Sequence, residues 1–120
     1  MNILVVDDEA IQVETLRRGL IAKGFRVLEA LNAEEALRHL SGETEQIDMV
    51  LTDYTMPGMN GIDLLKTIRQ KHAFLPVIVM TAYGEKKEVV ESFCDPHNGF
   101  LLKPFTLDNL VQEIQKIKKN

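Results

Sequence analysis

The sequence predicts an α/β fold in which five parallel strands and five helices form one doubly wound sheet. Short apolar runs of strand length alternate with longer segments whose apolar residues recur at helical spacing. The connections between them are short, and this alternation requires crossovers that make the strands parallel. The 120 residues suffice for one hydrophobic core but not for two, so residues 1–120 are expected to form a single domain.

The first two strands are separated by an amphipathic helix. The unbroken apolar run Ile3–Val6 predicts a strand that is buried on both faces. After it, the apolar residues follow the period of a helix, and Gly24 is suited to end that helix because glycine tolerates a positive φ angle. Phe25–Ala30 is expected to form the second strand. Its charged residues, Arg26 and Glu29, indicate a position at the edge of the sheet.

The middle of the chain contains the second helix and the third strand. Asn32 is suited to cap the helix, whose inner residues lie at i, i+3, i+4 and i+7: Ala33, Ala36, Leu37 and Leu40. The polar segment 41–46 is expected to be a loop. The apolar run Met49–Thr52 predicts a third strand with Asp53 at its carboxyl end, and the Pro57-Gly58 pair predicts a turn beyond it.

The second half of the chain continues this alternation. Asn60-Gly61 is expected to open a third helix, and Val77–Met80 is expected to form the fourth strand. Glu85–Cys94 has helical spacing and ends near a proline, which disfavours helix at the residue before it. Phe100–Leu102 is expected to be a short fifth strand. Thr106 is suited to cap a last helix, whose inner residues are Leu107, Leu110, Val111, Ile114 and Ile117.

Composition and charge exclude several classes of protein. The formal net charge of −4 argues against direct nucleic-acid binding by this domain, since such binding requires a basic surface. No apolar run approaches the roughly 20 residues that a membrane-spanning helix needs, and the amino terminus lacks the charged leader of a signal peptide. The single cysteine, Cys94, rules out an internal disulfide. These features predict a cytoplasmic protein that does not bind a membrane.

Polar and charged residues follow four of the predicted strands. Asp7 and Asp8 follow the first strand, Asp53 ends the third, Thr81 follows the fourth and Lys103 follows the fifth. Because the carboxyl ends of parallel strands lie at one edge of the sheet, these side chains are expected to converge where open α/β sheets bind ligands. Clustered carboxylates disfavour their own ionisation unless a cation intervenes. A hard divalent cation such as Mg²⁺ fits these oxygen ligands.

Each of these residues has a plainer interpretation when it is taken alone. Asp7 and Asp8 could simply favour the positive start of the following helix. Thr81 could be a loop hydroxyl, and Lys103 could be a surface lysine. Their joint occurrence at four strand ends favours a functional site. The three histidines do not share the spacing of metal ligands and are interpreted as surface or loop residues: His39, His72 and His97.

Four ordered motifs connect this pattern to a known family: Val5–Glu9, Leu51–Gly61, Met80–Ala82 and Leu102–Phe105. Together they resemble the receiver domain of bacterial two-component response regulators, and the resemblance covers essentially the whole chain. It implies a flavodoxin-like sheet with the strand order 2-1-3-4-5. One stretch departs from the family pattern, because Pro96-His97 replaces the usual small Gly-Ala pair before the fifth strand.

The resemblance also implies the roles of the acidic residues. Asp53 matches the phosphoacceptor of the family. Asp8 and Asp53 match the carboxylate ligands of Mg²⁺, whereas Asp7 acts mainly through a bound water. The backbone carbonyl of Thr55 matches the third protein ligand of the ion.

The remaining matches concern the phosphoryl group and its effect. Thr81 and Lys103 match the two side chains that hold the phosphoryl oxygens. Thr81 and Phe100 match a switch that relays phosphorylation to the surface of the fourth helix, fifth strand and fifth helix. The implied donor is a sensor histidine kinase or phosphotransfer protein, and the implied target is an output domain or effector protein. The same surface could form a dimer. Such a domain promotes its own phosphorylation and dephosphorylation but is not a turnover enzyme.

Two other classes of protein share parts of this pattern. A flavodoxin-like electron carrier would need an anion-binding turn after the first strand, where Asp7-Asp8-Glu9 would repel a cofactor phosphate. A metal-dependent phosphatase with an aspartate nucleophile would need a second acid to activate water, and the positions of Thr55 and Tyr83 offer none. The response-regulator interpretation is therefore the favoured one.

Overall fold

The computed structural model describes residues 1–42, 46–82 and 95–118. The strands are β1 (Asn2–Val6), β2 (Arg26–Ala30), β3 (Met49–Asp53), β4 (Val77–Thr81) and β5 (Asn98–Leu102). The helices in these ranges are α1 (Ala10–Ala22), α2 (Ala33–Ser41), α3 (Gly61–Lys71) and α5 (Leu107–Lys118). The fourth predicted helix, Glu85–Cys94, lies outside the described residues.

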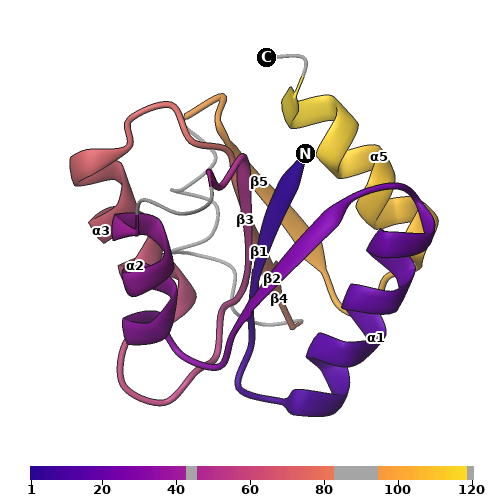
Figure 1. Ribbon diagram of the computed structural model, residues 1–120, viewed down its shortest axis with the longest axis horizontal. Helices are drawn as coiled ribbons and strands as arrows, with labels where there is room; N and C mark the ends of the chain where they lie inside the picture. The colour runs from indigo at the N-terminus through magenta and orange to yellow at the C-terminus, as the bar shows by residue number, and fades with distance from the viewer. Residues whose placement is uncertain (43–45, 83–94, 119–120) are drawn as a thin grey trace.

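The five strands form one parallel sheet in the order β2-β1-β3-β4-β5, which confirms the predicted doubly wound, flavodoxin-like topology (Figure 1). The charged strand β2 lies at the edge, as Arg26 and Glu29 indicated. The central strands β3 and β4 are buried along their whole length. Their apolar runs are therefore explained by helices that cover both faces of the sheet.

Two hydrophobic layers hold the helices on the sheet. Helices α1 and α5 cover one face, and α2 and α3 cover the other (Figure 1). On the α2/α3 side the strands contribute residues such as Leu4 and Val79. On the α1/α5 side they contribute residues such as Ile3 and Met80. Successive strand residues alternate between the two layers, so the described helices pack on both faces of the sheet.

The predicted caps and turns are present. The Asn32 side chain accepts a hydrogen bond from the Glu35 N–H at 2.8 Å, and the Asn60 side chain accepts one from the Asp63 N–H at 2.9 Å. Thr106 Oγ1 accepts a hydrogen bond from the Asn109 N–H at 3.0 Å. Gly24 and Gly58 have positive φ angles of 93° and 79°. These local signals fix where α2, α3 and α5 begin and where α1 ends.

Several element boundaries differ from the sequence prediction by one or two residues; β2, for example, starts at Arg26 rather than at Phe25. Helix α2 extends to Ser41, which the prediction placed in a loop. Strand β5 begins at Asn98, two residues before the predicted start at Phe100, because Asn98 and Gly99 pair with β4. A Cβ atom on Gly99 would overlap Ile117 Cδ1 of helix α5. The glycine therefore belongs to the strand, where its missing side chain makes room for α5.

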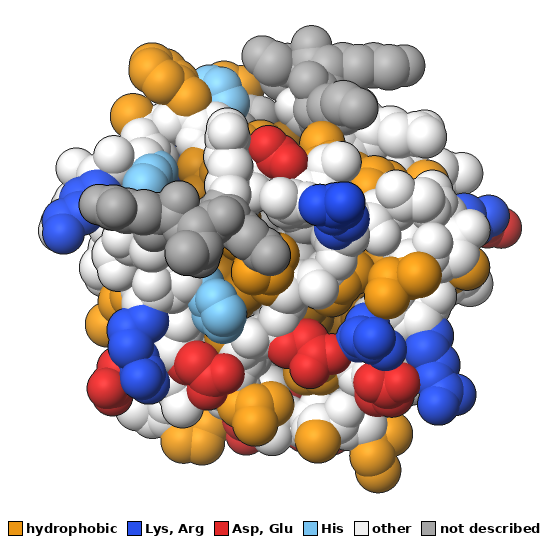
Figure 2. All heavy atoms as spheres, viewed as in Figure 1, with side chains coloured by type: hydrophobic (Ala, Val, Ile, Leu, Met, Phe, Trp, Pro, Cys, Tyr) orange, Lys and Arg blue, Asp and Glu red, His pale blue; other side chains and the backbone are white. Residues whose placement is uncertain are grey.

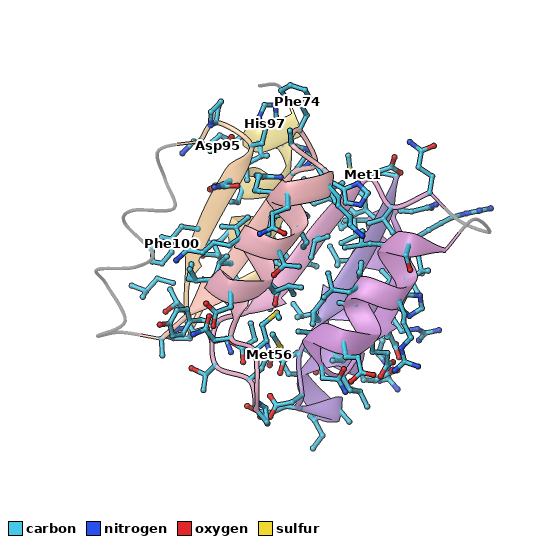
Figure 3. The ribbon with its side chains drawn as sticks, turned by 90° about the vertical axis from the view of Figure 1, so that its left-hand side faces the viewer. Met1, Met56, Phe74, Asp95, His97 and Phe100 are labelled. Atoms are coloured by element: carbon cyan, nitrogen blue, oxygen red, sulfur yellow. The ribbon has the colours of Figure 1, made fainter. Side chains whose placement is uncertain are left out.

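A polar cluster centred on Arg69 connects α3 to the amino-terminal ends of β4 and β5. Its guanidinium donates hydrogen bonds to the carbonyls of His72, Leu75 and His97 and to the Asn98 side chain. Its Nε also lies 3.6 Å from an Asp95 carboxylate oxygen. Figure 3 shows Asp95, His97 and Phe74 together at this end, far from Met56 at the other end.

The face of the molecule shown in Figure 2 carries charges of both signs. Acidic and basic side chains are interspersed over the face that Figure 2 presents, with single hydrophobic side chains between them. Within the described ranges, every helix is too short or too polar to cross a lipid bilayer.

Candidate functional site

The structure brings the predicted site residues to the carboxyl edge of the sheet. Asp7 follows β1, Asp53 is the last residue of β3, Thr81 is the last residue of β4, and Lys103 follows β5. The register explains this convergence. Val6 pairs with Thr52, Asp53 pairs with Met80, and Thr81 pairs with Leu102, so the four strands end at nearly the same level.

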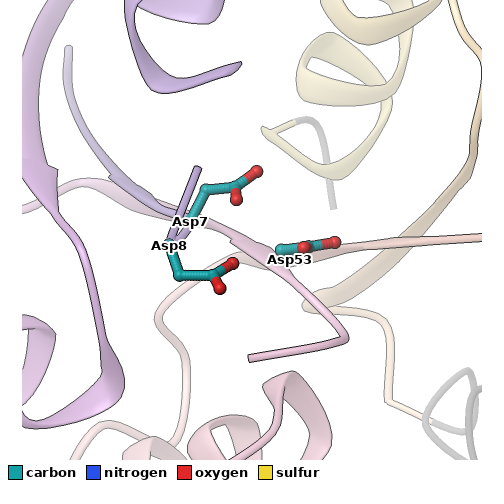
Figure 4. A group of neighbouring side chains, drawn as sticks. All are labelled: Asp7, Asp8 and Asp53. Atoms are coloured by element: carbon teal, nitrogen blue, oxygen red, sulfur yellow. The ribbon is translucent and has the colours of Figure 1, made fainter. Parts of the chain in front are cut away.

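Three carboxylates form an acidic cluster at this edge. One carboxylate oxygen from each of Asp7, Asp8 and Asp53 lies within 4.8 Å of the other two. Figure 4 shows Asp7 and Asp8 projecting from the end of β1 beside Asp53 at the end of β3. Asp7 is fully buried and Asp53 is only 5 % exposed, whereas Asp8 lies on the surface. The cluster is thus buried on the sheet side and open on the Asp8 side.

Lys103 pairs directly with Asp53. The Lys103 Nζ donates a hydrogen bond to Asp53 Oδ1 at 2.7 Å, and the Lys103 main-chain N–H donates to the Thr81 carbonyl at 2.8 Å. The second bond extends the β4–β5 ladder by one residue, so the lysine is carried on ordered backbone. A charge-assisted bond of this length to a buried carboxylate fixes the orientation of the Asp53 side chain.

Burial and mutual repulsion raise the pKa values of both buried acids. Burial is the main reason that the pKa of Asp7 rises from 3.8 to about 6, and the negative charge of Asp53 raises it further. The hydrogen bond that Asp7 accepts from the Glu9 N–H opposes this rise. Burial likewise raises the pKa of Asp53, against the hydrogen bond from Lys103. The single lysine therefore does not fully compensate the acidic cluster.

The donor set fits a hard divalent cation. The Oδ2 atom of Asp7 is buried and accepts no hydrogen bond from the described residues, so one oxygen of an acid in this cluster has no donor. Such an atom is costly to bury unless a cation or ordered water satisfies it. Carboxylate oxygens from Asp7, Asp8 and Asp53 are the ligand type that Mg²⁺ prefers.

Thr81 and Phe100 lie on neighbouring strands and on the same side of the sheet. Thr81 is 1 % exposed, and its hydroxyl donates to the Ala82 carbonyl at 3.2 Å. Phe100 pairs in register with Val79 and packs, partly buried, in the α2/α3 layer to which Val79 belongs. Since side chains alternate along a strand, Thr81 shares that side with Val79.

The loop between β3 and α3 carries Thr55, whose backbone carbonyl is the predicted third ligand. Thr55 is exposed, and the next residue, Met56, is buried in the α2/α3 layer. The Tyr54 N–H donates to the Met80 carbonyl at 2.8 Å. Sequence reasoning assigned no role to Met56, although an apolar residue between Thr55 and the Pro57 turn was a signal that the loop is anchored at that point.

The raised pKa of Asp7 predicts a measurable effect of Asp7→Asn on stability. Folding favours the protonated form of Asp7. The stability that this form contributes is fully present below pH 3.8 and is lost as the pH rises through about 6. Asparagine stays neutral. In EDTA at pH 7.5 the variant should therefore be more stable than the wild type by up to about 3 kcal/mol, and this gain should vanish near pH 4.

Denaturant unfolding at the two pH values measures this difference. Asp63→Asn on the exposed side of α3 is the matched control, with the same chemical change outside the cluster. An Asp7→Asn variant less stable than the wild type at pH 7.5 would show that the ionised carboxylate is favourable in the empty site, contrary to this account.

Comparison with known proteins agrees with this fold. A family model described as the response regulator receiver domain matches residues 3–115. The chemotaxis protein CheY-3 of Vibrio cholerae is 37 % identical over 123 residues, which cover 98 % of this chain and 91 % of CheY-3. Among solved structures, the response regulator protein TrrA of Thermotoga maritima, in complex with Mg²⁺-BeF, has a TM-score of 0.83, is 33 % identical, and matches over 97 % of each chain.

Some relatives are much longer than this chain. The DNA-binding transcriptional regulator NtrC of Escherichia coli is 37 % identical over 112 residues, which are 93 % of this chain but only 24 % of NtrC. The chain thus spans about a quarter of that relative and nearly all of CheY-3. Since the family model covers nearly the whole sequence and CheY-3 is similar over nearly its whole length, the chain belongs to the receiver domains of two-component response regulators.

Proposed function

We propose that this domain is a signalling switch in which Asp53 accepts a phosphoryl group from a sensor histidine kinase or phosphotransfer protein. The observation that carries the proposal is the Asp53 side chain. It is a nearly buried carboxylate held at 2.7 Å by Lys103 and flanked by two further acids. A fixed carboxylate beside a cation can act as a nucleophile toward phosphorus.

The transfer step balances with these residues. A carboxylate oxygen of Asp53 attacks the phosphorus of a phosphohistidine and forms an acyl phosphate, while the P–N bond breaks and its electron pair returns to the imidazole, which takes up a proton. Lys103 holds Asp53 before the step and offers positive charge to the phosphoryl oxygens during it. Thr81 would donate its hydroxyl to one of those oxygens. Such transfers depend on positioning and charge compensation more than on proton shuttling.

Mg²⁺ is the proposed cofactor. Asp7, Asp8, Asp53 and the Thr55 carbonyl would hold it, with Asp7 acting mainly through water. When bound, the ion supplies positive charge that compensates the phosphoryl oxygens. The acidic cluster and the lone Asp7 oxygen support this assignment, and TrrA was solved with Mg²⁺-BeF.

Incubation with acetyl phosphate and Mg²⁺ tests this function. Intact-mass measurement should show one addition of about 80 Da, which hydroxylamine removes because it cleaves acyl phosphates. EDTA should suppress the addition. No mass gain under any condition would contradict the proposal, and continuous phosphate release without a stable adduct would indicate a phosphatase instead.

We also propose that Thr81 and Phe100 relay the change to the surface of the fourth helix, β5 and α5. The two residues share one side of the sheet on adjacent strands, so a shift of Thr81 toward the phosphoryl oxygens would open space beside Phe100. A phosphoryl group can shift the equilibrium between two conformations of the domain only if it makes different contacts in each of them.

Thr81→Ala tests the relay. The variant should still be phosphorylated, but phosphorylation should change the NMR signals of Phe100 and Leu102 by less than half as much as in the wild type. Thr81→Ser retains the hydroxyl and should restore most of the response. Equal changes in the alanine variant and the wild type would exclude Thr81 as the link.

The proposal extends to partners and location. The target would be an output domain or effector protein that binds the fourth helix, β5 and α5, and the same surface could mediate dimerisation. The domain is placed in the cytoplasm, where response regulators meet their kinases, and it is not assigned direct nucleic-acid binding. It would promote its own phosphorylation and dephosphorylation without acting as a turnover enzyme.

A further inference from the structure

Gly61 lies where helix α3 meets the main chain of Asp53. It is the first residue of α3 and is buried. A Cβ atom built on it would overlap the Asp53 carbonyl oxygen and would lie 2.9 Å from Tyr54 Cα and 3.1 Å from the Asp53 carbonyl carbon. All three are backbone atoms. No rotamer change could relieve such a contact, so any larger residue must displace either the end of β3 or the start of α3.

Both partners in this contact are fixed from other directions. The Gly61 N–H donates to the Tyr54 carbonyl at 2.8 Å, and the Tyr54 N–H donates to Met80 on β4 at 2.8 Å. On the helix side, Asn60 caps α3 through its bond with the Asp63 N–H, and Met56 anchors the intervening loop in the α2/α3 layer. The Asp53 main chain is therefore held between β4 and the first turn of α3.

This junction sets the geometry of the acidic site. The 2.7 Å contact between Lys103 and Asp53 depends on where the Asp53 backbone sits, and so does the separation of Asp53 from Asp7 and Asp8. The same junction closes the loop that carries the Thr55 carbonyl. The backbone displacement that a Cβ atom on Gly61 would force would move the carboxylate and the loop together.

We propose that Gly61 is a positioning residue for phosphoryl transfer to Asp53, an inference that rests on the proposed function. Its missing side chain lets α3 abut the Asp53 carbonyl and so holds the nucleophile in line with Lys103. Misplacement of reacting groups by about 1 Å can cost about 100-fold in rate. Gly61→Ala should therefore slow phosphorylation far more than its effect on stability would explain.

The test compares second-order rate constants for phosphorylation by acetyl phosphate at saturating Mg²⁺ and a temperature at which each variant is folded. Gly61→Ala should be slower than the wild type by at least about tenfold. Gly99→Ala is the matched control. Its Cβ would overlap Ile117 Cδ1 and lie 3.1 Å from Ile78 Cγ1, which are side-chain atoms away from the acidic cluster. It should lower the melting temperature while its rate constant stays within about twofold of the wild type.

A spectroscopic readout separates positioning from general destabilisation. The amide signals of Asp53 and Tyr54 should shift in Gly61→Ala and remain unchanged in Gly99→Ala. If Gly61→Ala does not fold, Asn60→Ala replaces it, since loss of the cap loosens the start of α3 without steric overlap. That variant should be slower by at least about threefold.

The possible results separate the positioning role of Gly61 from the proposed phosphoryl transfer to Asp53. A wild-type protein that gains no phosphoryl group would overturn both. A phosphorylated wild type with Gly61→Ala equally fast, or with Gly99→Ala equally slow, would overturn the positioning role alone. Unchanged Asp53 and Tyr54 signals in Gly61→Ala would also overturn it.

Discussion

Replacing Asp53 by asparagine is expected to abolish phosphoryl uptake from acetyl phosphate while leaving the domain folded. Asparagine has nearly the same shape, but its amide cannot form an acyl phosphate. The fold should tolerate the change because two effects oppose each other. The variant loses the 2.7 Å ion pair with Lys103 and also removes one charge from the acidic cluster. Since the pKa of Asp53 is raised despite Lys103, a small gain in melting temperature is expected.

Intact-mass measurement after incubation with acetyl phosphate and Mg²⁺ checks this result. Asp63→Asn, an exposed acid in the first turn of α3, should still gain one phosphoryl group at the wild-type rate. Adduct formation on Asp53→Asn at a comparable rate would place the nucleophile on Asp7 or Asp8 and would refute the assignment to Asp53. Loss of the folded circular-dichroism signal would show that the ion pair is needed for folding.

Much of the fold could be predicted because the buried strands carry simple signals. Ile3–Val6 and Val77–Met80 are unbroken apolar runs, and only a strand covered on both faces accounts for such runs with short connections. Parallel pairing then brings the residues after each run to one edge. The approach of Lys103 to Asp53, fifty residues apart in the chain, follows from that topology alone.

Other features depend on tertiary contacts that no local pattern encodes. Strand β5 starts at Asn98 because pairing with β4 and packing of Ile117 accommodate a polar residue and a glycine that have weak strand preference. His97, interpreted as a surface or loop residue, lies in a loop, but its ring nitrogen is 3.1 Å from Asp95. In the sequence, Gly61 indicates only the start of a helix. Its close approach to the Asp53 main chain depends on how α3 packs against the sheet.

Arg69 is the clearest example of a residue whose role depends on tertiary contacts. In the sequence it is a cation in the last turn of an amphipathic helix, a position usually explained by the helix dipole. In the structure its side chain is only 16 % exposed and reaches residues up to 29 positions away. Pro96-His97, which departs from the family pattern, lies between Asp95 and Asn98, two of its partners. The altered turn is therefore held by the arginine.

Arg69→Met is expected to destabilise the domain by about 3 kcal/mol, which corresponds to a fall of roughly 10 °C in melting temperature. Methionine fills similar space but removes the donor that the carbonyls of His72 and Leu75 share. The His97 carbonyl loses the same donor but keeps its hydrogen bond from the Val77 N–H. The hydrogen bond from the His97 N–H is the main cause of the lowered pKa of Asp95, and the variant removes the smaller contribution of the Arg69 charge. Thermal unfolding at neutral pH measures the loss. Arg38→Met is the control. It removes an exposed ion pair, in which Arg38 lies 3.9 Å from Glu34, and should change the melting temperature little.

Arg69→Lys separates charge from hydrogen-bond geometry. A lysine keeps the positive charge near Asp95, but its compact ammonium cannot reproduce the fork that serves four acceptors at once. It should therefore recover less than half of the stability lost in Arg69→Met. The cluster lies at the sheet edge opposite Asp53, so both variants should be phosphorylated at the wild-type rate below their melting temperatures. An Arg69→Met variant as stable as Arg38→Met would show that water replaces the guanidinium without cost.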